Sequence, residues 1–551
     1  MLVLATVTPA VGLAAAQDDT PNRFAEGLSE AAAETGGIVQ YSIPDDAATG
    51  GAETDPHWIV TLESSEDLSA LRDWASTDRR TILSVDNSTN QTVVRAPPSA
   101  VGTSMLDSLL GGGLATAGYV ERVDLQMIHS VPEQPDPMAT EEFESPRILP
   151  DLVAPGSFDQ TGVAYSGDFN QSTLGDVRES INATNTTATG ENVTIAILDT
   201  GINTANGQVF GNGTAGSQVR IDAARNFVDD TDATAANDWE NVSDGDGHGT
   251  WVAAAAAANH ANDSYDGMAP DASLVIGKVL ADVGSGTTTD IVDAVHWACE
   301  EQNADVVSMS LGGLTYSATL ADAVEECAVE HNTTIMVATG NSGITQPVGI
   351  ASPADTRGDD PQSDGIIAVS ATNVSNASTA GPAYFAQGGV DPGADFSNGR
   401  TAGAMPTVTA PGTAIEAPTP TEDGSVAYTT LSGTSMSTPI VSGAVALSME
   451  GTGGQNGTVA EQRVAHSAAP VQHGGATEVG AGMVDVGALL QMPYENVPEG
   501  SYYADQRDAQ TDLATARDRA HLSVGDGLFD QLADESVFGT GALLPTLEVA
   551  S

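Results

Sequence analysis

The spacing of apolar residues along the chain predicts two folded regions. In the first region, strands with alternating apolar and polar positions are expected at residues 57–62, 81–85, 92–96 and 119–128. Two segments have helical spacing, with one apolar face formed by Leu68, Leu71 and Trp74 and the other by Val101, Met105 and Leu109. Ser64, followed by Asp67, predicts a capping box at the first helix. The order β-α-β-β-α-β is typical of a small ferredoxin-like α+β domain, here at about residues 55–130.

In the second region, short apolar strands alternate with helices. Strands are expected at residues 193–198, 273–279, 305–310 and 334–338, and helices from His248, from Asp290 and around 320–329. Strands that alternate with helices pair in parallel and are covered on both faces. We therefore expect an α/β fold over residues 190–490, with a parallel sheet and helices on both faces. Sites in such sheets lie beyond the carboxyl ends of strands, where Asp199, Ser310 and Asn341 fall.

The remaining segments lack these patterns. Residues 132–189 are rich in Pro, Glu, Thr and Asn and are interpreted as a linker and lead-in, and residues 491–551 form a tail of unknown role. Residues 1–16 resemble the apolar core of a signal peptide without its charged start. Either the true start lies upstream or this is a frayed apolar end; we favour the truncated signal. No other apolar run approaches the roughly 18 residues needed to span a membrane.

The net negative charge of the chain excludes some classes of binding partner. Against 75 Asp and Glu stand only 17 Lys and Arg, a formal charge of −58 over 551 residues, and Lys278 is the sole lysine. Such a balance excludes nucleic acid and anionic membrane as natural partners. Self-repulsion should strain a compact fold in dilute buffer, whereas at about 1 M salt the screening length falls to roughly 3 Å. Because the carboxylates are spread along the whole chain, adaptation to molar salt is favoured over an acidic disordered tail.

The two cysteines, Cys299 and Cys327, are too few for a disulfide framework, and their spacing matches no zinc site. One disulfide would form if the segments around them are neighbouring helices on one face of the sheet. Otherwise both are buried free thiols, and the sequence leaves the two alternatives open.

Three short strings carry the groups that turn a serine hydroxyl into a nucleophile. They are Ile197–Gly201, Asp246–Thr250 and Ser432–Pro439. An imidazole must take the proton of the hydroxyl, and a carboxylate must hold that imidazole in the right tautomer. Taken singly, Asp199 is a turn former, His248 a surface residue and Ser435 a helix cap. Together, in this order and with these flanking glycines, they predict a catalytic triad.

The region from about Val193 to Leu447 resembles the subtilisin-like serine proteases, or subtilases, in which the triad has this chain order. The acidic composition makes halolysin-like enzymes the most similar branch. The resemblance implies that Asn341, in the string Ala338–Gly343, supplies an amide to the oxyanion hole together with the Ser435 backbone N–H. The alternative for Asn341 is an asparagine in a glycine turn.

The resemblance also implies an extended peptide as substrate. The edge formed by Ser310, Leu311 and Gly312 would pair with the substrate backbone, by addition of a β-strand. Gly284 and Gly286 would lie on the opposite substrate-binding strand.

Two departures from the family pattern stand out. Trp251 follows Thr250 where the family continues with a second histidine. The usual calcium loop offers oxygen donors from Asn259, Asn262, Asp263 and Asp266, but Gln208 stands where the family places a carboxylate. The chemistry requires no cofactor, a structural calcium ion is left open, and no residue is assigned to a metal.

By the same resemblance, residues 17–131 are similar to an inhibitory propeptide that is removed autocatalytically. The sequence is therefore interpreted as a secreted, extracellular, salt-adapted serine endopeptidase made as a zymogen and acting on proteins or peptides. We expect a monomer whose own propeptide is an intramolecular inhibitor. Two alternatives remain: a non-catalytic peptide-binding relative, and a processing transpeptidase that uses the same triad.

Overall fold

The computed structural model describes two main parts of the chain, residues 55–131 and 171–492, together with strands β1 (Leu2–Leu4) and β2 (Gln40–Ser42). Within the main parts the description omits residues 77–78, 87–88, 102–113, 115–116, 230, 233–239, 314–316, 342–349, 357–364, 373–382, 384–404, 422, 451–456 and 472–475. Most of the expected signal segment, residues 132–170 of the expected linker, and residues 493–551 lie outside the described residues. So do Met105 and Leu109 of the expected second helix.

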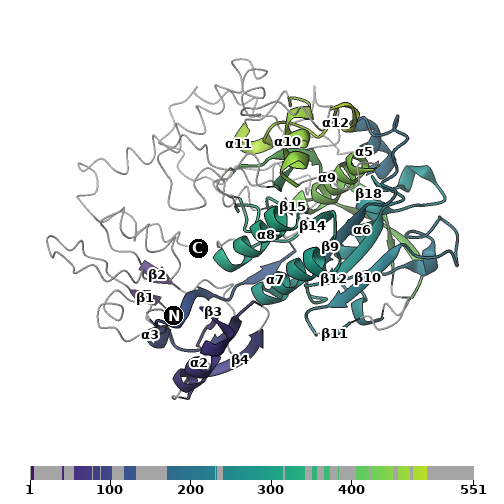
Figure 1. Ribbon diagram of the computed structural model, residues 1–551. Helices are drawn as coiled ribbons and strands as arrows, with labels where there is room; N and C mark the ends of the chain where they lie inside the picture. The colour runs from purple at the N-terminus through teal and green to yellow at the C-terminus, as the bar shows by residue number, and fades with distance from the viewer. Residues whose placement is uncertain are drawn as a thin grey trace, which may run out of the picture.

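A sheet of eight strands forms the centre of the larger part (Figure 1), in the order β11-β10-β12-β9-β14-β15-β16-β17. Its strands are β9 (Thr194–Asp199), β10 (Ile221–Asn226), β11 (Thr231–Asp232), β12 (Ser273–Lys278), β14 (Val306–Met309), β15 (Thr334–Ala338), β16 (Ile366–Thr372) and β17 (Val408–Pro411). All neighbours pair in parallel except β10 and β11. The chain moves from β9 to one side and then crosses to β14 on the other, so the strand order reverses at β9. The predicted parallel α/β fold is confirmed.

Both faces of this sheet are covered, which explains why its strands are almost wholly apolar. Successive residues of one strand enter different cores: Ile195 and Ile197 join one, Ala196 and Leu198 the other. On the first face lie α5 (Leu174–Ser180), α6 (His248–Ala257), α9 (Thr434–Met449), α10 (Gly457–Ser467) and α12 (Val486–Gln491). On the second lie α7 (Thr288–His296), the π-helix η6 (Trp297–Glu301) and α8 (Ala318–Glu330).

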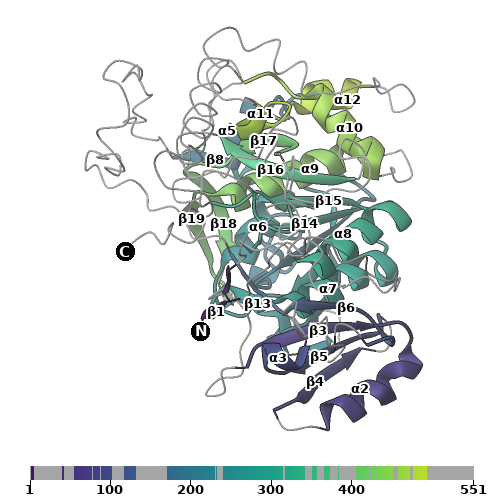
Figure 2. The same cartoon turned by 90° about the vertical axis from the view of Figure 1, so that its left-hand side faces the viewer.

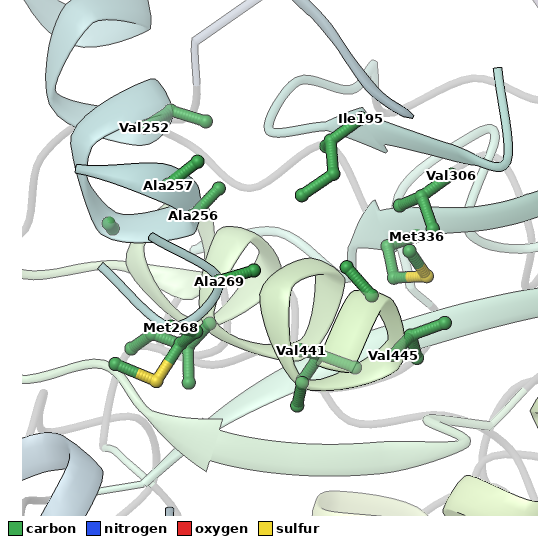
Figure 3. Close-up of a cluster of buried hydrophobic side chains, with 14 of the residues drawn as sticks. Ile195, Val252, Ala256, Ala257, Met268, Ala269, Val306, Met336, Val441 and Val445 are labelled. Carbon is green, nitrogen blue, oxygen red and sulfur yellow. The ribbon is translucent and has the colours of Figure 1, made fainter. Parts of the chain in front are cut away.

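Small side chains allow the helices of the first face to approach the sheet and one another closely. Figure 3 shows Ile195, Val306 and Met336 from three strands together with Ala256 of α6 and Val445 of α9. All ten residues of α6 are buried, which accounts for its run of alanines. The helix that begins at His248 is therefore held inside the core along its whole length.

The smaller part, drawn in purple below α7 in Figure 2, is a four-stranded antiparallel sheet in the order β4-β5-β3-β6. Its elements are β3 (His57–Leu62), η1 (Ser65–Asp67), α2 (Leu68–Ala75), β4 (Thr81–Asp86), β5 (Gln91–Arg95), α3 (Pro98–Val101) and β6 (Val120–Leu125). This is the strand order of a ferredoxin-like domain. The expected capping box is wrong: the Ser64 hydroxyl donates to the Asp67 carboxylate and makes no cap to the backbone.

Further elements border the central sheet. A hairpin of β18 (Ile415–Pro420) and β19 (Val426–Leu431) pairs with β8 (Ser172–Thr173), and β13 (Ser285–Thr287) pairs with β7 (Ile128–Ser130). Short helices complete the described elements: η3 (Ala205–Gly207), η4 (Glu240–Val242), η5 (Asp263–Tyr265) and α11 (Ala476–Val479). Leu174 and Val177 of α5, in the expected lead-in, are buried in the first core.

The two cysteines form a disulfide between η6 and α8, with Cα atoms 5.8 Å apart. Of the alternatives left by the sequence, the structure selects the bridge between neighbouring helices. None of the helices in the described part of the chain combines the length and apolar character needed to cross a bilayer.

Candidate active site

The carboxyl edge of the central sheet holds the predicted catalytic residues. Asp199 is the last residue of β9, and His248 is the first residue of α6. The His248 Nδ1 atom lies 2.8 Å from Asp199 Oδ1, and both side chains are buried. Ser435, the second residue of α9, exchanges hydrogen bonds with Ser310, which follows β14, the neighbour of β9. The three elements therefore meet where the strand order of the sheet reverses.

The nucleophile and the base are not hydrogen-bonded in this structure. The Ser435 hydroxyl donates to the Ser310 carbonyl at 3.3 Å, and His248 Nε2 has no hydrogen-bond partner within the described residues. Hydrogen bonds between catalytic groups are often long or poorly aligned until substrate is bound. Rotation about the Cα–Cβ bond of Ser435 redirects the hydroxyl away from Ser310.

Glycines on both sides of His248 permit the sharp entry into α6. Gly247, just before the helix, has φ of 93°, a conformation that favours glycine. A Cβ atom at Gly249 would lie 2.5 Å from the Gly201 carbonyl oxygen. The start of α6 is thus pressed directly against the loop that follows Asp199.

The backbone at the start of α6 is held by the buried carboxylate of Asp244, which the sequence analysis missed. One of its oxygens accepts from the Thr200 hydroxyl and the Gly247 N–H, at 2.8 and 2.7 Å. The other accepts from the backbone N–H and hydroxyl of Thr250, at 2.7 and 2.6 Å. The carboxylate therefore accepts hydrogen bonds from amides at the N-terminus of α6. Its negative charge is stabilised there by the positive end of the helix dipole. An Asp four positions before His248 was the available signal.

The electrostatic surroundings of His248 favour its charged form. Burial lowers the pKa of His248, but the charge and hydrogen bond of Asp199, with the charges of Asp244 and Asp246, outweigh it and raise the pKa above its ordinary value of 6.5. The pKa of Asp246 is itself raised, mainly by burial and against the opposing effect of His248. The imidazole is thus prepared to accept a proton.

Asn341 contacts Thr434, the residue before Ser435, and its oxyanion-hole role stays a prediction. Its side-chain oxygen accepts from the Thr434 N–H at 2.9 Å and from the Thr434 hydroxyl at 3.0 Å. These bonds fix the amide plane next to the N-terminus of α9. Gly433 has φ of 154°, and a Cβ there would lie 3.0 Å from the Asn341 Nδ2 atom. Close approach of this amide requires glycine at that position.

The two predicted substrate-binding edges enclose a strand of the chain itself. Strand β7 pairs antiparallel with β13, so that His129 lies opposite Gly286, and the Val131 N–H donates to the Gly284 carbonyl at 2.8 Å. On its other side, Ser130 and Gly312 exchange two backbone hydrogen bonds of 3.2 Å. Residues 128–131 therefore form the middle strand between the two edges. Of the remaining predicted residues, Ser310 contacts Ser435, and Leu311 is buried in the second core.

The side chain of His129 is buried within this arrangement. Its Nε2 atom lies 3.0 Å from the hydroxyl oxygen of Thr288, the first residue of α7. Burial lowers the pKa of His129 to about 4, so the imidazole is neutral near neutral pH. The edges thus hold a β-strand by its backbone and take one of its side chains into the protein.

A cleft of about 730 Å³ extends from this strand past His248. Ser130, Val131, Asp246 and Val283 are among its lining residues. The β18–β19 hairpin forms one wall, to which it contributes Thr419, Pro420, Thr421, Asp423, Ala427, Thr429 and Leu431. The cleft thus borders both the strand of residues 128–131 and His248, the one triad residue among its lining residues.

Trp251, the departure from the family pattern, connects the triad helix to that wall. Its side chain is fully buried, and its Nε1–H donates to the Thr429 carbonyl of β19 at 2.9 Å. The indole therefore lies between α6 and the hairpin and joins the two.

Two of the oxygen donors expected for calcium, Asp266 and Asn262, accept hydrogen bonds from the protein backbone. Asp266 accepts from the His260 N–H at 2.8 Å and lies 3.8 Å from Arg178, and the Asn262 oxygen accepts from the Ser264 N–H. In the described part of the chain, no group of three or more His, Cys, Asp or Glu side chains is arranged to hold a metal ion. Two of the four expected donors thus already have protein partners, and a structural calcium ion at this loop stays an expectation from the sequence.

Comparisons with known proteins agree with this geometry. Residues 190–486 match the model of the subtilase family. The chain is 33% identical over 259 residues to the major intracellular serine protease of Bacillus subtilis, covering 47% of this chain and 68% of that protein. It is 30% identical over 302 residues to subtilisin DY of Bacillus licheniformis, covering 55% and 92%. Fervidolysin of Fervidobacterium pennivorans, a keratinolytic enzyme related to subtilisin, has a similar fold, with a TM-score of 0.57, 19% identity and coverage of 83% of this chain and 63% of that chain.

The pH dependence of acyl transfer at this site should follow His248. Only the neutral imidazole accepts the Ser435 proton, so kcat/KM should fall about tenfold per pH unit below the His248 pKa. Because that pKa is raised, the acid midpoint should lie above 6.5. Asp246→Asn removes a charge that raises the pKa, so a pH–rate profile should show the midpoint at lower pH.

Asp423→Asn is the matched control, because Asp423 lines the same cleft but is not among the charges that act on His248. An equal displacement of the midpoint in both variants would contradict the assignment to Asp246.

Substitution of Trp251 should separate its packing from its hydrogen bond. Trp251→Phe keeps an aromatic ring and removes the donor to Thr429, and should lower the free energy of unfolding by about 1 kcal/mol. Trp251→Ala also empties the space between α6 and the hairpin and should cost about 3–5 kcal/mol. Urea unfolding in molar KCl measures both, and a Trp251→Phe variant as stable as the wild type would refute a role for the indole N–H.

Proposed function

We propose that this chain, which belongs to the subtilase family, is a serine endopeptidase that is exported, works in molar salt and is made as a self-processing zymogen. Family membership makes it a hydrolase of the subtilisin type that acts on protein substrates. Salt adaptation, export and self-processing are the proposal. The observation that carries it is the strand of residues 128–131, held between the two substrate-binding edges at the end of the cleft.

In the proposed mechanism, His248 accepts the proton of Ser435 as the hydroxyl attacks the peptide carbonyl. Asp199 holds the Nδ1–H tautomer and stabilises the imidazolium that forms. The oxyanion is stabilised by the Asn341 amide and the Ser435 backbone N–H at the start of α9, and loss of one such donor typically costs roughly 10²–10³ in kcat. The imidazolium then protonates the leaving amine, and water hydrolyses the acyl-enzyme. The chemistry needs no cofactor.

The N-terminal domain is proposed to be the inhibitory propeptide. Besides the strand in the cleft, it contacts the two helices of the second face. Arg122 of β6 forms ion pairs with Asp124 and with Asp322 of α8, and Asp124 accepts a hydrogen bond from Thr319. Gln126 donates to Thr289 of α7 at 2.9 Å. The domain is thus docked by polar contacts, while its last strand occupies the place of a substrate.

Two observations support the remaining parts of the proposal. The formal charge of −58 favours a protein that folds where salt screens its carboxylates. The apolar segment at residues 1–16 supports export, and the disulfide between Cys299 and Cys327 is compatible with an oxidising compartment. We propose that the mature enzyme acts as a monomer outside the cell.

The two alternatives make different products. A non-catalytic relative would bind peptides and resist sulfonyl fluoride reagents, whereas a serine peptidase is inactivated by them. A transpeptidase would yield ligated or cyclised products instead of new amino termini. Mass-spectrometric mapping of cleavages in a peptide library distinguishes all three.

Substitution of the nucleophile tests both turnover and maturation. Ser435→Ala should abolish hydrolysis and leave the precursor intact, because one nucleophile performs both reactions. The wild-type protein, expressed in molar salt, should mature to a new amino terminus within residues 132–137, just after the strand that enters the cleft. Amino-terminal sequencing checks this, and a Ser435→Ala protein that is processed without added protease would refute the mechanism.

Salt should determine stability and activity. Raising KCl from about 0.1 to 1 M shortens the screening length from about 10 to 3 Å and relieves repulsion among the carboxylates. The melting temperature and kcat/KM should both rise over this range, as measured by circular dichroism and peptide hydrolysis. NaCl at equal concentration is the control for a specific effect of potassium, and values independent of salt would exclude the adaptation.

A further inference from the structure

The sole lysine of the chain lies next to the catalytic aspartate. Lys278 is the last residue of β12 and is paired in register with Asp199 on the neighbouring strand β9. Its side chain is buried. All the other basic residues among the 17 Lys and Arg are arginines. A single lysine therefore remains in the chain, and it lies at the carboxyl edge of the sheet where the triad is built.

The ammonium group of Lys278 joins the two loops that carry Asp199 and His248. Its Nζ atom donates to the Thr200 carbonyl at 2.6 Å and to the Ser243 carbonyl at 2.9 Å. Its third donor goes to Asp282 at 2.6 Å. The three protons of an ammonium group are thus matched by three acceptors, which a buried charge requires.

One carbonyl belongs to a residue that contacts the triad, and the other to the residue before Asp244. The Thr200 N–H donates to Asp199 Oδ1 at 2.7 Å, and the Thr200 hydroxyl accepts from the Gly249 N–H in the first turn of α6. Ser243 immediately precedes Asp244, whose carboxylate holds the entry to the same helix. The distance between Asp199 and His248 therefore depends on two loops that a single ammonium group connects.

We infer that Lys278 is a positioning residue for the Asp199–His248 pair. Lys278 acts through the Thr200 and Ser243 carbonyls and contacts neither the substrate nor the reacting atoms. The inference rests on the proposed role of the triad. An arginine would not replace it, because a planar guanidinium directs its donors differently from a compact ammonium group with three converging acceptors.

The test compares Lys278→Met and Lys278→Arg with Arg220→Met. Arg220 is a matched control, because it is a partly buried cation that donates to the backbone carbonyls of Gly211, Ala257 and Ala272, and it precedes β10 at the opposite edge of the sheet. A misplacement of about 1 Å can cost roughly 10² in rate. Lys278→Met should therefore lower kcat per folded molecule at least tenfold and change KM less than twofold. Lys278→Arg should not restore kcat, and Arg220→Met should lower stability only.

A second measurement, the proton NMR spectrum of His248, requires neither catalytic turnover nor maturation of the precursor. In the Ser435→Ala precursor, the Nδ1 proton of His248 in its short hydrogen bond to Asp199 should give a resolved downfield proton resonance. Lys278→Met should move or broaden it, and Arg220→Met should leave it in place. An unchanged resonance and kcat in Lys278→Met, full rescue by arginine, or equal effects of Lys278→Met and Arg220→Met would overturn the inference. An inactive wild-type enzyme would instead count against the proposed function.

Discussion

The structure depends on one constraint: a parallel sheet must be covered on both faces. Because the side chains of β9 alternate between two cores, neither face is left for chemistry, and polar groups collect where strands end. Parallel pairing brings the carboxyl ends of seven of the eight strands to one edge, and the strand order reverses at β9. Asp199, the start of α6 and the start of α9 meet at that edge for this reason.

At the carboxyl edge of the sheet the charged groups are buried. Burial of a charge costs free energy unless the group has an oppositely charged or hydrogen-bonding partner. The site meets the requirement with short, convergent hydrogen bonds. Asp244 accepts four of them at the N-terminus of α6, and Lys278 donates three between the neighbouring loops. The Asp199–His248 pair is therefore flanked by charged groups held by both main-chain and side-chain atoms. Salt screens interactions between buried groups much less than interactions between surface charges.

The sequence predicted the parts of this arrangement that depend on local pattern. The strand 57–62 has the predicted bounds, β9 and β12 differ from the predicted bounds by one residue, and Asp199 and Ser310 lie at strand ends as expected. What it missed or left open depends on contacts between distant segments. The role of Asp244 requires the loop after β9, the Cys299–Cys327 bridge requires two helices to be neighbours, and the link from Trp251 to Thr429 joins residues 178 positions apart. The capping box failed for a local reason, since the Ser64 hydroxyl and Asp67 carboxylate bind each other directly.

In the proposed zymogen, the strand of residues 128–131 connects the fold to its regulation. Its backbone hydrogen bonds to Gly284 and Gly312 do not depend on sequence, whereas the buried His129 side chain is specific to this strand. What also distinguishes the chain's own strand is that it is tethered to a domain docked on α7 and α8. Tethering makes its effective concentration at the edges far higher than that of a free peptide. In the proposed zymogen, cutting the chain after the strand leaves its backbone contacts unchanged, so we expect release to begin at the docked domain, where the Arg122 ion pairs are only partly buried.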